Sequence, residues 1–116
     1  MYKLKLKHHF DSAHRLKLNY DSKCEGIHGH RWEVIIEIWK NTLDDNGMII
    51  DFSKLKGKID ELDHKMLNDM VKFNPTAENL SKYLHDEFMK LGVFERLKLT
   101  IYESPGASIS YEMPRT

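Results

Sequence analysis

Residues 28–39, with the sequence HGHRWEVIIEIW, alternate between side chains typical of a buried face and side chains typical of a solvent-exposed face. In a strand, successive side chains point to opposite faces, so every second residue shares a face. Charged residues, namely Arg31, Glu33 and Glu37, mostly line one face. The other carries His28, His30, Trp32, Val34, Ile36 and Ile38. The stretch therefore predicts a strand from about Ile27 to Trp39 whose inner face starts with two histidines.

Three further stretches alternate in the same way. Lysines and apolar residues alternate strictly from Tyr2 to Phe10, and Ser12 and His14 join the inward set if that alternation continues. Residues 97–103 and 107–113 alternate late in the chain, on either side of a Pro-Gly turn. The sequence therefore predicts four strands.

Two amphipathic stretches lie between the second and third strands. Asp51 is a capping residue for a helix that we expect to end near Asp63-His64. Pro75-Thr76 opens the second helix, and Gly92 is predicted to stop it. The apolar positions of the first helix are Phe52, Leu55, Ile59, Leu62 and Met66.

The resulting order, ββααββ, predicts an α+β fold. Two amphipathic helices can cover one face of a four-stranded antiparallel sheet. The outer strands of such a sheet keep unpaired edges, which a symmetric ring of subunits would cover. The sequence therefore favours an oligomer.

The composition limits the classes of protein to which this chain can belong. The chain has 116 residues, 41% of them hydrophobic, which predicts one domain over residues 1–116. Eighteen basic residues balance eighteen acidic ones, which argues against nucleic acid as a partner. The chain start lacks the apolar core of a secretion signal, and no apolar run is long enough for a membrane span. With one cysteine and no disulfide framework, a cytoplasmic protein without a membrane partner is expected.

The histidines of the first two strands are candidate metal ligands. His28 and His30 project from one face roughly 7 Å apart at the backbone, and His14 on the neighbouring strand is a plausible third ligand. Three imidazoles with an open position are typical of a catalytic zinc site. The alternative is a set of ordinary hydrogen-bonded strand histidines.

Five other residues are candidates for chemistry, each with a simpler alternative. Cys24 lies in a polar loop where a nearby cation would favour its thiolate, but it can also be a fourth zinc ligand or an inert thiol. Glu25 is either a solvated loop acid or a second base. Asp63-His64 reads either as a catalytic pair or as a helix-end histidine. Glu103 has inward parity, which is costly for a carboxylate unless something pairs with it. The polarised edge of a ligand would serve, and the alternatives are a nearby arginine or simple exposure at the strand end.

Taken together, these segments resemble the family of 6-pyruvoyltetrahydropterin synthase and 6-carboxytetrahydropterin synthase. The likeness covers nearly the whole chain, with the segments in the family's order. They are FDSAHRL (10–16), CEGIHGH (24–30), GMIIDFSKLK (47–56), LDHKMLND (62–69), NPTAENL (74–80) and YESPGASISY (102–111).

The resemblance implies the tunnelling fold and a set of roles for named residues. It implies a catalytic group formed by Cys24 with Asp63 and His64, and Glu103 as the anchor of a pterin ring. It also implies homohexamers built as dimers of trimers, with active sites at subunit interfaces. The zinc ligands it implies are His14, His28 and His30.

Within the family, the three-residue gap between Cys24 and His28 resembles the bacterial 6-carboxytetrahydropterin synthases. This implies a zinc-dependent lyase of queuosine biosynthesis that converts 7,8-dihydroneopterin triphosphate to 6-carboxy-5,6,7,8-tetrahydropterin, releasing acetaldehyde and triphosphate. Alternatives are a dual or folate-pathway enzyme that forms 6-hydroxymethyl-7,8-dihydropterin with Glu25, or a 6-pyruvoyltetrahydropterin synthase. Non-enzymatic alternatives are a zinc-dependent pterin-binding module and a structural zinc protein.

Overall fold

The computed structural model describes residues 1–113, apart from the side chain of Cys24, and contains a four-stranded antiparallel sheet in the order β1-β2-β3-β4. The strands are β1 (Tyr2–His14), β2 (His28–Lys40), β3 (Arg96–Ser104) and β4 (Ala107–Tyr111). The helices are the 3-10 turn η1 (Lys23–Glu25), α1 (Phe52–Asp60), α2 (Leu67–Met70) and α3 (Ala77–Met89). The predicted order of four strands and two long helices is confirmed.

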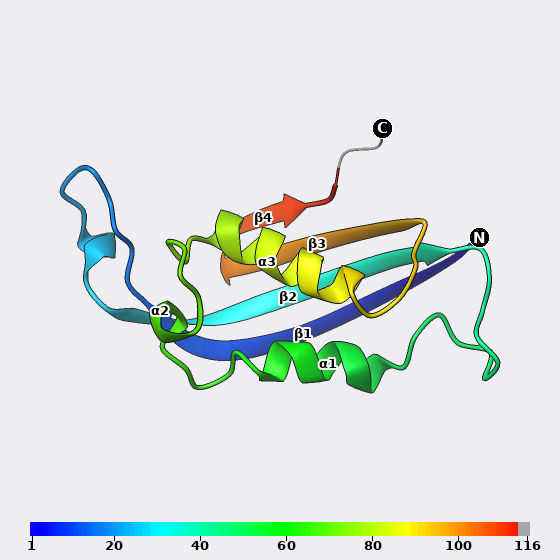
Figure 1. Cartoon of the computed structure of the whole chain (residues 1–116). Coiled ribbons are helices and arrows are strands. Elements are labelled where there is room, and N and C mark those ends of the chain that lie inside the picture. The colour runs from blue at the N-terminus through cyan, green and yellow to red at the C-terminus, as the bar shows by residue number, and fades with distance from the viewer. Residues whose placement is uncertain (114–116) are drawn as a thin grey trace.

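Helices α1 and α3 lie against the sheet and enclose one core cluster with it (Figure 1). The inward residues predicted from alternation form much of this cluster. Phe10 and Trp32, on adjacent strands, are fully buried and stack with ring centroids 5.9 Å apart. This core fixes the register, because a slip by one residue would turn every inward side chain to the opposite face.

Strands β1 and β2 pair along their whole length, and the pairing ends where both strands carry histidines. Leu4 lies opposite Ile38, Phe10 lies opposite Trp32, and the last pair is His14 with His28. The histidines therefore lie where the sheet ends, beside the loop that connects the two strands.

The helix starts agree with the prediction, but the helix ends do not. Asp51 accepts a hydrogen bond from the Ser53 N–H, and Thr76 accepts one from the Asn79 N–H. Helix α1 stops at Asp60 rather than near Asp63-His64, because the following residues turn to bond with β1. The short helix α2 was not predicted.

Gly92 does not act as the predicted helix stop. Helix α3 ends at Met89 with Lys90 as its cap, and among the described glycines only Gly47, in the predicted Asn46-Gly47 turn, has a positive φ. A Cβ at Gly92 would lie 2.9 Å from the Phe94 ring. A side chain at Gly92 would therefore have to displace the Phe94 ring, so this glycine serves packing and not backbone conformation.

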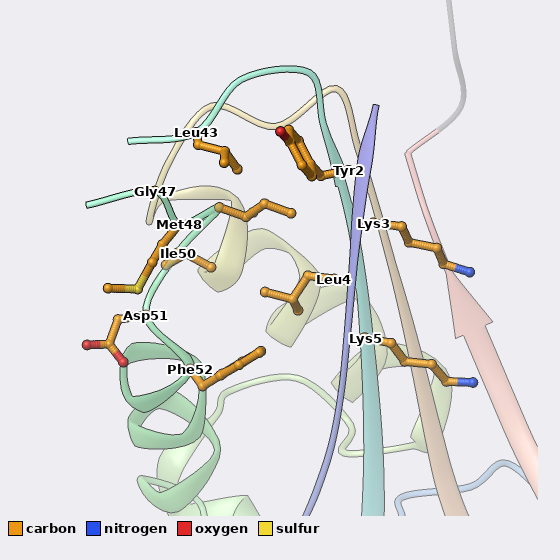
Figure 2. A pocket seen from close by; sticks show the side chains of 11 residues that line it. Tyr2, Lys3, Leu4, Lys5, Leu43, Gly47, Met48, Ile50, Asp51 and Phe52 are labelled. Atoms are coloured by element: carbon orange, nitrogen blue, oxygen red, sulfur yellow. The ribbon is translucent and has the colours of Figure 1, made fainter. Parts of the chain in front are cut away.

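An apolar cavity of about 500 Å³ lies at the opposite end of β1 from the histidines. Figure 2 shows Tyr2, Leu4, Leu43 and Ile50 around it, while Lys3 and Lys5 point away from it. Phe52, one of the apolar positions of the first predicted helix, borders this cavity and is 52% exposed, so it lies outside the core. It is the first residue of α1, and it lies at the rim of the cavity.

The outer edges of the sheet lack a strand partner within the described chain, apart from a single bridge between Ala13 and Met66. Across residues 1–113, no helix has the length and apolar character needed to cross a membrane. The assignment of residues 1–116 to one domain stays a prediction.

Candidate metal centre

Three imidazoles and one carboxylate converge at the end of the sheet. The pair His14–His28 and the next inward residue, His30, come from β1 and β2, and Glu103 reaches them from β3. One ligand atom from each of the four residues lies within 4.8 Å of every other. The Nε2 atoms of His14 and His28 are 2.8 Å apart, and Glu103 Oε1 is 3.1 Å from His30 Nε2 and 3.5 Å from His14 Nε2.

Backbone carbonyls determine which nitrogen of two rings carries the hydrogen. His14 Nδ1 lies 2.7 Å from the Pro75 carbonyl oxygen, and His28 Nδ1 lies 2.7 Å from the Gly26 carbonyl oxygen. A carbonyl can only accept, so each Nδ1 must donate. In the neutral rings, both Nε2 atoms therefore present lone pairs to the centre of the group.

These converging acceptors need a positive charge between them. Two bare ring nitrogens at 2.8 Å cannot hydrogen-bond to each other, and the buried His30 Nε2 has no hydrogen-bond partner despite the nearby Glu103 oxygen. Burial lowers the pKa of His14 and of His30, which disfavours protonation as the solution. The donor set therefore fits a metal ion.

Trp32 forms the floor of this group. Its ring meets those of His14 and His30 edge to face, with centroids 4.9 and 5.3 Å apart. Trp32 is fully buried and its indole N–H donates to the Ser12 carbonyl, so the position of the indole ring is fixed. The two imidazoles rest on the hydrophobic core and have little rotational freedom.

Asp63 and His64 form a hydrogen-bonded pair that is not part of the group of three histidines and Glu103. Asp63 Oδ2 lies 2.8 Å from His64 Nδ1, and its other oxygen accepts the Asp11 N–H, which holds the pKa of Asp63 below its ordinary value. The His64 N–H donates to the Asp11 carbonyl. The His64 side chain is 81% exposed, and its φ of 55° is uncommon for a residue other than glycine. The helix-end reading of this pair is wrong, because α1 ends earlier.

Cys24 and Glu25 lie in the loop between β1 and β2. The Cys24 backbone belongs to η1, and the predictions made for its thiol lie outside the described part of the structure. Glu25 is half-buried and lines a cavity of about 440 Å³ with Arg15, Lys17 and Asn68.

The sequence does not reveal the two carbonyls that hold the rings. In the sequence, Pro75 marks only the start of a helix and Gly26 only a position in a loop. Backbone acceptors carry no residue-type signal, so only the fold could reveal them.

The fold and this site define a class: α+β proteins with three histidines and a glutamate gathered at one end of an antiparallel sheet. The sequence matches the family described as 6-pyruvoyl tetrahydropterin synthase over residues 3–114. The chain belongs to this family.

Individual relatives agree with that assignment. A 6-carboxy-5,6,7,8-tetrahydropterin synthase from Rickettsia conorii is 33% identical, and the alignment covers 86% of this chain and 92% of that protein. Relatives from Pyrococcus horikoshii and Pyrococcus abyssi are 48% and 34% identical, over 50% and 88% of this chain, but the alignments span only 36% and 62% of those proteins.

The solved structure of the 6-pyruvoyl tetrahydropterin synthase of Caenorhabditis elegans superposes with a TM-score of 0.75 at 26% identity. The superposition covers 97% of this chain and 96% of that one. The predicted tunnelling fold is confirmed.

Proposed function

We propose that this protein is a 6-carboxy-5,6,7,8-tetrahydropterin synthase of queuosine biosynthesis. It would convert 7,8-dihydroneopterin triphosphate to 6-carboxy-5,6,7,8-tetrahydropterin and release acetaldehyde and triphosphate. The observation that carries the proposal is the convergence of three imidazole nitrogens and the Glu103 carboxylate within 4.8 Å. Family membership and the named activity of the Rickettsia conorii relative support the choice of a pterin substrate.

The imidazoles of His14, His28 and His30 would hold Zn²⁺. Ligand nitrogens about 2.0–2.1 Å from a tetrahedral zinc ion lie about 3.4 Å from one another, a separation that a group of this size can reach with small movements. When bound, zinc supplies Lewis acidity toward the side-chain hydroxyls of the substrate. The carbonyls of Pro75 and Gly26 keep two of the rings in the tautomer that zinc requires.

Glu103 would anchor the pterin ring. Its side chain is about one-third exposed, so its carboxylate can accept neighbouring ring and exocyclic N–H groups in a forked pair. A fourth zinc ligand is the other possible role. In Glu103→Gln, loss of pterin binding with zinc retained supports the anchor, whereas loss of zinc supports the ligand role.

The proton transfers would use Cys24, Asp63 and His64. The contact with Asp63 occupies His64 Nδ1, which leaves the exposed Nε2 to exchange a proton with a thiol. Because His64 faces solvent in the single chain, we propose that it completes the site of another copy in a cytoplasmic homohexamer, a dimer of trimers, as the resemblance implies. The free sheet edges support such an assembly.

The decisive experiment incubates the zinc-loaded protein with dihydroneopterin triphosphate and identifies the product by mass spectrometry. Formation of 6-carboxytetrahydropterin is expected. Cys24→Ala should bind the pterin but form no product, which also separates an enzyme from a pterin-binding module. A 6-pyruvoyl product, or none, would refute the proposal.

Glu25 supports one alternative, formation of 6-hydroxymethyl-7,8-dihydropterin. Its carboxylate is half-buried in a cavity next to η1, a place where a second base would be useful. If this activity exists, Glu25→Gln should remove the hydroxymethyl product and leave the carboxy product. If Glu25→Gln leaves both unchanged, Glu25 takes no part in the reaction.

A further inference from the structure

Beyond the last strand pair, residues 15–17 continue β1 as a segment held by two asparagines. Asn68 accepts the Arg15 N–H and donates to the Arg15 carbonyl, both at 2.8 Å. Asn74 does the same with Lys17, at 2.9 and 3.0 Å. Each side-chain amide thus replaces a strand partner. These asparagines belong to the LDHKMLND and NPTAENL segments, and the chemistry proposed above gives them no role.

This clamp fixes where two cations point. Bonding at residues 15 and 17, but not at 16, is the pattern of extended chain, in which residues two apart project to the same side. Arg15 and Lys17 are exposed, whereas Leu16 between them is half-buried. Two asparagines therefore hold two positive side chains next to each other.

These two cations have no ion-pair partner among the described residues. Elsewhere on β1, Lys3 and Lys7 are paired with Glu37 and Glu33 across the sheet. Arg15 and Lys17 instead line a cavity of about 440 Å³ together with Leu16, Asn68 and Glu25. Glu25 contributes one negative charge there, so this cationic cavity keeps an excess of positive charge.

Two chain segments connect the cationic cavity directly to the metal centre. Arg15 directly follows His14, and Glu25 directly precedes Gly26, whose carbonyl holds His28. An extended chain advances about 3.3–3.6 Å per residue, so Lys17 begins roughly 10 Å from His14. By the same alternation, Arg15 and Lys17 project to the face opposite His14. The β1–β2 ladder ends at the pair of His14 with His28, so a ligand that reaches both sites would pass around this end of the sheet.

We propose that Arg15 and Lys17 bind the polyphosphate tail of the substrate whose reacting side chain lies at the metal centre. A linked chain of phosphates matches a guanidinium and an ammonium on one side of an extended backbone, because the guanidinium binds phosphate oxygens in pairs and the ammonium acts as a point charge. The identity of the tail rests on the function proposed above. Glu25 lines the same cavity, where its negative charge would offset part of the attraction for the phosphates.

Inorganic triphosphate tests this site without turnover. Its affinity is measured by isothermal titration calorimetry for the full-length wild-type protein, the double variant Arg15→Gln/Lys17→Gln and the double variant Lys54→Gln/Lys56→Gln. The last removes the same charge from exposed positions of α1. All three keep the metal ligands, so chelation of metal by the probe is common to them.

We expect the first double variant to bind triphosphate about 100-fold more weakly, roughly tenfold for each charge-assisted contact. The control should stay within about twofold, and the wild-type affinity should fall steeply with added salt. Equal losses in both double variants, or no loss in the first, would overturn the proposal. Circular dichroism confirms that each variant is folded.

Failure of this proposal and of the proposed function are separable. If the wild type binds triphosphate through Arg15 and Lys17 but forms no 6-carboxytetrahydropterin, the proposed function fails and the phosphate site stands. If product forms and the first double variant keeps the wild-type affinity and KM, the phosphate site fails and the function stands.

Discussion

The two ends of β1 belong to the same sheet but differ in whether buried polar atoms there lack hydrogen-bond partners. At the end near Tyr2, apolar side chains surround a cavity, and nothing in its lining demands a ligand. At the His14 end, Nε2 of His30 lacks a hydrogen-bond partner, and two neighbouring ring nitrogens face each other as acceptors. Open space alone therefore says less about function than the polar atoms that point into it, since unpaired buried polar atoms are costly and an exposed apolar surface is ordinary.

The largest effect is expected from His28→Ala at the histidine end. Removing one imidazole should abolish stoichiometric metal binding and lower turnover by more than about 100-fold, because loss of even an outer-shell partner costs about 10–100-fold. Elemental analysis and product formation measure the two effects. His9→Ala, an exposed strand histidine of opposite parity, should change neither. Equal losses in the two variants would remove the contrast between the ends.

At the other end of the strand, Leu4→Ala should change stability and leave metal binding alone. Leu4 is 8% exposed, so the truncation should cost about 2–4 kcal/mol of unfolding free energy, measured by urea denaturation. Leu43→Ala, at a side chain that is 37% exposed on the same cavity, should cost less than about 1 kcal/mol. A tenfold loss of metal affinity in Leu4→Ala would show that the two ends are coupled.

Acid should weaken the metal-free protein through the histidine end. Burial lowers the pKa of His14 and His30 below that of the unfolded chain, partly offset by Glu103. As pH falls below about 6.5, the unfolded chain gains protons that the folded rings resist, so stability falls by up to about 1.4 kcal/mol per pH unit for each ring.

Lowered carboxyl pKa values, as at Asp63 and Asp11, act at lower pH, so the window just below 6.5 belongs to the imidazoles. Urea denaturation between pH 7.5 and 5.5 in buffers of about equal ionic strength measures the slope. His30→Gln should flatten it, and Leu4→Ala should leave it unchanged. A wild-type slope that His30→Gln does not alter would contradict the assignment.

The smallest effect is expected at Phe52, on the rim of the apolar cavity. Because its side chain is 52% exposed, Phe52→Ser should shift the unfolding free energy by no more than about 0.5 kcal/mol and leave turnover intact. Thermal unfolding and a turnover assay suffice. A large loss of stability would mean that Phe52 is covered by another molecule in solution.

Strand parity was sufficient to predict the inward faces and the nearness of three histidines and Glu103, whereas their roles as zinc ligands and pterin anchor stay predictions. His14, His28 and His30 follow from period-two alternation in adjacent antiparallel strands, and Glu103 from the same rule on β3. What alternation could not reveal are contacts made by the backbone or across the fold. The carbonyls of Pro75 and Gly26 are of this kind.

Helix ends were predicted less well for a related reason. Helix α1 stops early because residues 63 and 64 form hydrogen bonds with Asp11, about fifty positions earlier in the chain. In the sequence Gly92 resembles a helix stop, but in the structure it leaves room for the Phe94 ring. Local propensity is a weak prior where such tertiary contacts compete.

The ligand group draws its members from positions 14 to 103, and its ring holders include Pro75. No early portion of the nascent chain contains it, because Glu103 arrives only when β3 pairs with β2. A truncated translation product with β1 and β2 alone would carry all three imidazoles, but it would lack Glu103 and the Pro75 carbonyl that orients the His14 ring. The complete group of four residues therefore forms only in the finished fold.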